Sequence, residues 1–185
     1  MGEYYLIAQL PSLDTVDDHA PLPITEERFL ELTERLLGKR AWQRVQGLTL
    51  APARDAERTG NALIDAWNDG ERRLRIALSK ARASKMGKPF DAGELPLPCG
   101  LADVACAAVE AKDPMEAERC LIAYRLGFLE TLRPADAFSE NFVFYYGLKL
   151  KLLARMKRFD TELGRSAYKN IYTSVLSKEG LEAAQ

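Results

Sequence analysis

Residues 138–160, FSENFVFYYGLKLKLLARMKRFD, decide the fold class of this 185-residue chain. Apolar residues recur in this stretch every three or four positions, which is the period of an amphipathic α-helix. Five of them share one side of a helical wheel: Tyr145, Leu148, Leu152, Met156 and Phe159. Ser139 can cap the first turn, so the pattern predicts a helix from 139 to about 158 with one buried face.

Basic residues occupy the other side of this predicted helix. Lys151, Lys157 and Arg158 lie there, and together with Arg155 they are the candidate partner-binding residues of the chain. Two interpretations stay open. The basic side is either the solvated exterior of a core helix or a surface that docks an acidic partner, because opposite charges across an interface favour association.

Capping signals predict further helices along the chain. Thr25 precedes Glu26 and Glu27, and acids are favoured at a helix start by the helix dipole. We therefore expect a helix over 25–37. Asp113 followed by Pro114 is the favoured pairing of a cap with proline at the first helical position. This pairing predicts a helix over 114–131. Small apolar residues predict a helix over 101–111, and apolar residues at helical spacing predict helices over 161–177 and 54–84, the last with a candidate break at Gly70.

The sequence as a whole predicts an all-α protein of six or seven helices in an irregular bundle. Val and Ile are sparse, Ala and Leu are plentiful, and no segment shows strict alternation of apolar and polar residues. A short strand remains an alternative only for the opening YYLIAQL, residues 4–10. Residues 38–52 are ambiguous, and GLTLAP within them is typical of a loop.

One connection divides the chain. Residues 86–100, MGKPFDAGELPLPCG, are dense in Gly and Pro, which is typical of irregular structure. This predicts an N-terminal helical part over 1–88 and a C-terminal helical part over 99–185. The two parts form either one compact domain or two closely packed lobes, since the chain is long enough to bury a substantial core.

The apolar opening fails as a targeting sequence. No positive residue precedes it, as a signal peptide requires, and it is about a third of the length that a membrane-spanning helix needs. We therefore expect a soluble, cytoplasmic protein. We also expect Tyr5, Leu6, Ile7 and Leu10 to pack against the C-terminal half of the chain.

The sequence offers no catalytic or metal-binding motif. The one histidine, His19, lies in an acidic loop, where a solvated side chain is the simplest interpretation. Cys99, Cys106 and Cys120 form no C-x-x-C pair, which argues against a zinc site and favours buried thiols. We expect no enzyme activity, no cofactor and no metal.

A basic stretch runs from 71 to 88, ERRLRIALSKARASKMGK, with seven cations after its single acid. On a helical wheel these cations spread around most of the circumference, whereas a phosphate-tracking site clusters them on one side. No aromatic residue is interleaved to stack on bases. We expect no nucleic-acid partner. The alternative is a helical scaffold, regulatory or RNA-binding module.

Three segments then suggest a family. YYLIAQLPSL (4–13), PLPITEERFLEL (21–32) and FSENFVFYYGLKLKLLARMKRFDTELGRSAYKNI (138–171) run in an order that resembles a small, largely uncharacterised bacterial family. The genes of that family typically lie among those for V/A-type ATPase subunits. The chain also resembles a shortened, distant relative of the C-type subunit of these rotary ATPases, which is named d in eukaryotes.

The resemblance implies a non-catalytic role. The C-type subunit is a socket between the central shaft and the membrane ring of proteolipid subunits, and it is built from three helical lobes. This chain has room for one or two. The resemblance therefore implies an adaptor or accessory component whose partners are the rotor shaft and the proteolipid ring, located in the cytoplasm and peripheral to the inner membrane.

Overall fold

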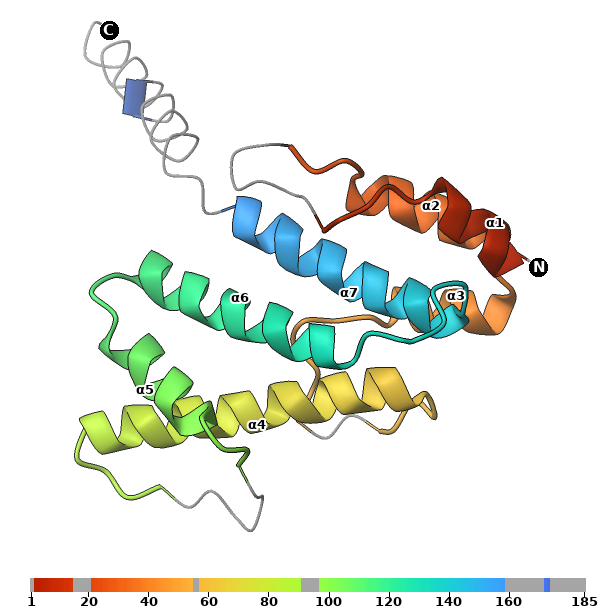
Figure 1. Cartoon of the computed structure of the whole chain (residues 1–185). Helices are drawn as coiled ribbons and strands as arrows, with labels where there is room; N and C mark the ends of the chain where they lie inside the picture. Colours follow the sequence, from red (N-terminus) through yellow and green to blue (C-terminus); the bar gives the residue numbers. More distant parts are fainter. Residues whose placement is uncertain (1, 15–20, 55–56, 91–96, 159–171, 174–185) are drawn as a thin grey trace, which may run out of the picture.

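A computed structural model describes residues 2–14, 21–54, 57–90, 97–158 and 172–173. Within these ranges it has seven named α-helices and no strand (Figure 1). The helices are α1 (Gly2–Gln9), α2 (Glu26–Leu36), α3 (Lys39–Gln46), α4 (Ala62–Lys85), α5 (Leu101–Glu110), α6 (Pro114–Thr131) and α7 (Glu140–Lys157). The prediction of an all-α protein is confirmed. The expected helix over 161–177, Phe159 and His19 lie outside the described residues.

The helix starts follow the capping signals of the sequence. The side chain of Thr25 accepts a hydrogen bond from the backbone N–H of Arg28 at 3.2 Å. Asp113 does the same for Glu116 at 2.7 Å, and Ser139 caps α7 in the same way. Each cap satisfies a backbone donor that has no partner within its helix, so these starts are fixed by local sequence.

Helix α7 lies at the centre of the bundle, between α1, α2 and α3 on one side and α4 and α6 on the other (Figure 1). All residues from 143 to 150 are buried. The expectation of one buried face and one basic face is therefore wrong for this part of the helix, because neighbouring helices contact α7 from both sides and cover its circumference. Its first turn and its last two turns are partly open to solvent.

The opening segment is a helix, so the strand alternative is excluded. Leu6 is fully buried, and Ile7 and Leu10 pack against the same core. The expectation for Tyr5 is wrong, because its side chain is 63% exposed. After α1 the chain is held to α7 by Tyr146, whose hydroxyl donates to the carbonyl of Pro11 at 2.8 Å.

The apolar core is divided into a larger and a smaller cluster. The larger one gathers side chains of α1, α2, α3, α7 and one end each of α4 and α6. The smaller one is formed by the other half of α4 with α5 and the start of α6. Helix α4 belongs to both clusters, since Trp67 lies in the larger and Leu74 in the smaller.

Gly70 does not break α4, which runs without interruption through it. Its role is steric. A Cβ atom at this position would lie 2.2 Å from Cε1 of Phe128, so the absence of a side chain lets the Phe128 ring of α6 approach the α4 backbone. The ambiguous residues 38–52 contain α3, followed by a loop whose Leu48 is buried in the larger cluster.

No helix among the described residues is both long and apolar enough to cross a membrane.

Candidate interaction site at the end of helix α7

The structure brings together three of the four candidate partner-binding residues. Lys151, Arg155 and Arg158 follow one another at spacings of four and three at the end of α7, which places them on one side of the helix. With Glu26 of α2 and the loop 48–50 they line a hollow of about 200 Å³, called here the α7 hollow. Lys157 does not line it.

Two of these cations already have partners within the fold. The ammonium of Lys151 donates to Glu26 at 3.2 Å, and the guanidinium of Arg155 donates to Glu118 of α6. The basic side is thus partly used to join α7 to α2 and α6. A one-helix projection could not reveal this, because both acids come from distant segments.

Arg158 is exposed at the C-terminal end of α7. Its charge reaches Glu27 at the start of α2. The pKa of Glu27 lies below its ordinary value because its own backbone N–H and the Thr25 hydroxyl donate to the carboxylate, and Arg158 adds a smaller attraction. The rim of the hollow therefore carries both signs of charge.

A buried charge network continues inward from the hollow. Arg125 of α6 donates two hydrogen bonds to Glu71 of α4, at 2.8 and 3.2 Å, and its guanidinium lies 3.9 Å from Glu118. The Glu71 side chain is only 2% exposed. Since Glu118 also binds Arg155, the network links α4, α6 and α7.

Sequence reasoning missed this pair, although a signal was present. Glu71 follows Trp67 by four positions and precedes Leu74 by three, so it lies on the apolar face of α4. A carboxylate on such a face needs a buried cation. The sequence does not say which cation supplies it.

A second charged cluster surrounds Lys149 of α7, which is buried, whereas its two carboxylate partners are exposed. Its ammonium donates to Asp14 at 2.6 Å and to Glu130 at 2.8 Å, and the Tyr145 hydroxyl donates to Glu130 at 2.6 Å. Burial alone lowers the pKa of a lysine, but these hydrogen bonds outweigh burial and raise the pKa of Lys149. Lys149 therefore stays charged and links α7 to Asp14 and to Glu130 of α6.

The described residues offer no site for a metal ion, since no group of three or more His, Cys, Asp or Glu side chains converges among them. The expectation of buried thiols is wrong for Cys99 and Cys106, which are exposed, whereas Cys120 is half-buried. The short helix α5 turns Cys106 outward because Leu101, Ala105 and Ala108 occupy its buried side.

Several cations of the basic stretch 71–88 also have roles within the fold. Arg72 pairs with Asp69 at 2.8 Å, Arg75 donates to the carbonyl of Pro52 at 2.6 Å, and Lys85 donates to the carbonyl of Val109 at 2.7 Å. These partners come from three different segments of the chain. These contacts do not favour a polyanion partner over the alternatives.

Comparisons of the chain with models of protein families, with curated proteins and with solved structures found no match. A function can therefore be inferred only from the sequence pattern and from the geometry of the chain itself.

Proposed function

We propose that this chain is a non-catalytic adaptor or accessory component of a bacterial V/A-type rotary ATPase, similar in role to the C-type subunit. In this role it would contact the central shaft and the proteolipid ring, and would reach the membrane only through the complex. The proposal starts from the three segments that resemble proteins associated with these ATPases.

One observation carries the proposal beyond the sequence pattern. The described parts of the segments that bear the resemblance, 4–13, 21–32 and 138–158, contact one another through α1, α2 and α7. Tyr146 binds the carbonyl of Pro11, Lys149 binds Asp14, and Leu6 is buried in the same core. Similar sequence segments that contact one another in the fold support a family relationship better than similar segments that lie far apart.

The α7 hollow is the surface that we assign to the partner. Arg158 is exposed there, and Lys151 and Arg155 lie beside it. An acidic side chain of a partner protein could replace water at these cations without breaking the core. Charged groups at the rim of an interface mainly steer association and select the partner, which is the task of an adaptor.

The test is a pull-down of purified rotor shaft subunits from the same bacterium by the tagged, full-length chain. We expect Arg158→Glu to weaken capture by about tenfold, the scale of one lost charge pair. Arg40→Glu is the matched control. Arg40 is exposed on α3, which contacts the opposite end of α7 through the pair Arg44–Glu140.

The charge reversal Lys151→Glu is less informative than Arg158→Glu alone. The same holds for the double variant with Arg158→Glu. It would place a carboxylate beside Glu26, at the position where an ion pair now lies 3.2 Å across, and would destabilise the fold as well as the surface. If wild-type chain retains no shaft protein, the proposed function is wrong. If Arg158→Glu and Arg40→Glu bind alike, the α7 hollow is not the contact.

A further inference from the structure

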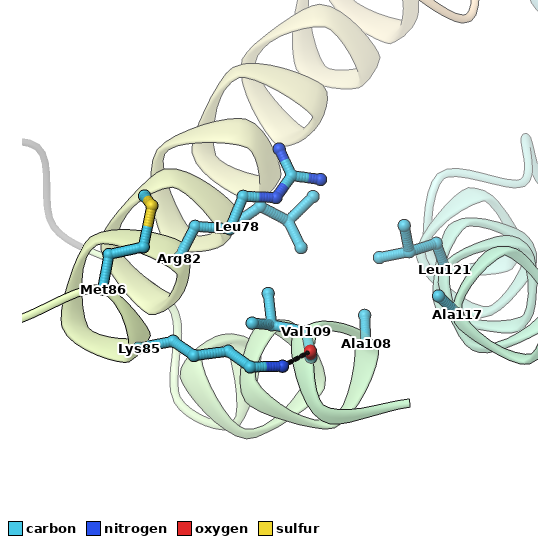
Figure 2. A pocket seen from close by; sticks show the side chains of 8 residues that line it. All are labelled: Leu78, Arg82, Lys85, Met86, Ala108, Val109, Ala117 and Leu121. Carbon is cyan, nitrogen blue, oxygen red and sulfur yellow. Dashed lines mark hydrogen bonds between the residues drawn. The ribbon is translucent and has the colours of Figure 1, made fainter. Parts of the chain in front are cut away.

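A second hollow lies where the C-terminal part of α4 meets α5 and the start of α6 (Figure 2). We call it the α5 groove. Its volume is about 370 Å³. It is lined by Leu78, Arg82, Lys85, Met86, Ala108, Val109, Ala117 and Leu121.

The groove exists because two of the helices present small side chains to it. Ala108 of α5 and Ala117 of α6 leave space that larger residues would fill, and Leu78 and Leu121 point toward that space (Figure 2). Met86, at the end of α4, is 62% exposed beside it. Flexible methionines suit surfaces that accept an apolar partner.

The charged residues of this groove are of one sign. Among the residues that the structure describes, Arg82 and Lys85 are the only charged ones that line it, and none of the lining residues is acidic. The ammonium of Lys85 donates to the carbonyl of Val109 at 2.7 Å (Figure 2), which fixes one positive charge at the rim. Arg82, three positions earlier on α4, adds a second positive charge to the same groove.

We propose that the α5 groove binds an acidic amphipathic helix of a partner protein. One large apolar side chain of that helix would enter between Leu78 and Leu121, and its carboxylates would lie against Arg82 and Lys85. Such helices dock through apolar residues at positions i, i+3, i+4 and i+7. The groove is only partly enclosed, whereas small-molecule sites enclose most of their ligand.

This inference goes beyond the proposed function, because it concerns a surface that the α7 hollow does not share. Arg82 and Lys85 belong to α4, whereas Arg158 lies at the end of α7. If the chain does not bind the rotor shaft, the proposal for the α5 groove still stands. If the α5 groove binds no helix, the proposed function still stands.

The test is selection of displayed helical peptides on the immobilised full-length chain. The library fixes apolar residues at i, i+3, i+4 and i+7 and varies all other positions. We expect enriched peptides to carry Asp or Glu beside a large apolar anchor. The affinity of such a peptide, measured by fluorescence anisotropy, should fall at least tenfold on Ala117→Leu, which fills the groove, and about tenfold on Arg82→Glu.

Two further measurements complete the test. A peptide with its carboxylates replaced by lysines should regain affinity for Arg82→Glu, and Arg40→Glu should bind the original peptide as wild type does. Circular dichroism checks the fold of Ala117→Leu, and if that variant is unfolded the charge-swap result decides. Absence of enrichment, enrichment of basic peptides, or unchanged affinity for a folded Ala117→Leu overturns the proposal.

Discussion

Lys149 and Asp14 lie 135 residues apart in the sequence and form an ion pair of 2.6 Å between Nζ and Oδ1. The lysine belongs to the central helix, and the aspartate follows α1. Because the lysine is only 8% exposed, the pair fixes the N-terminal segment to the middle of the bundle. Glu130 of α6 binds the same ammonium, so one cation joins three parts of the chain.

Replacing this lysine by an apolar residue of similar length should loosen the N-terminal segment. We expect Lys149→Met to lower the free energy of unfolding by about 2 kcal/mol, the scale of hydrogen bonds to charged groups. The loss stays moderate because Asp14 and Glu130 keep Arg133 as a neighbour, at 3.8 and 3.7 Å. Urea unfolding followed by circular dichroism measures the change.

Lys80→Met is the control for that experiment. Lys80 is exposed on α4, and surface substitutions of this kind change stability by about 0.5 kcal/mol or less. Equal unfolding midpoints for the two variants would contradict the stabilising role of the Lys149 ion pairs.

The same cluster makes stability depend on pH. The hydrogen bond from Lys149 lowers the pKa of Asp14 below its ordinary 3.8. For Glu130, burial would raise the pKa, but hydrogen bonds from Lys149 and Tyr145 outweigh it and bring the pKa below 4.5. Both carboxyls therefore bind fewer protons when folded than when unfolded. Their contribution is complete above the ordinary pKa values and is lost as the pH falls through the lower, folded values.

We expect the urea midpoint of the wild type to fall as the pH drops below about 5, and to fall less steeply in Lys149→Met. Lys80→Met should keep the wild-type slope. Parallel pH profiles for all three proteins would show that other carboxyls, and not this cluster, govern the acid response.

The starts of α2, α6 and α7 could be predicted from the sequence because each depends on residues that are neighbours along the chain. The start of α4 was expected near residue 54, but the helix begins at Ala62, where Asn61 supplies the cap. Thr25, Asp113 and Ser139 all cap helices as expected. The periodicity of α7 was also sufficient to predict a helix. It was not sufficient to predict that residues 143 to 150 are buried on every side, because the neighbours of a helix are set by tertiary packing.

The candidate site was only partly predictable for the same reason. Spacing placed Lys151, Lys157 and Arg158 on one side of α7, whereas the structure brings Lys151 and Arg158 together with Arg155 and leaves Lys157 out of the hollow. Their acidic neighbours Glu26 and Glu118 are 125 and 37 residues away from their partners. No local rule connects such positions in a single sequence.

The pair of Glu71 and Arg125 should show strong coupling. Removing one member leaves the other charged in a buried place, so Glu71→Leu should destabilise the fold by about 3 kcal/mol. The double variant Glu71→Leu with Arg125→Met replaces both charges by apolar groups and should recover most of that loss. A double-mutant cycle from urea unfolding measures the coupling, and simply additive losses would contradict it.

Gly70 provides the sharpest steric test of the packing of α4 against α6. In an open helix, Gly→Ala stabilises by about 1 kcal/mol through helix propensity. At Gly70 the new Cβ would meet the Phe128 ring, and overpacking of this kind costs about 1–3 kcal/mol. We therefore expect Gly70→Ala to be destabilising, whereas Gly127→Ala should stabilise, since nothing lies within 4 Å of a Cβ there. In a Phe128→Leu background the penalty for Gly70→Ala should largely vanish; if it persists in thermal unfolding, contact with the ring is not its cause.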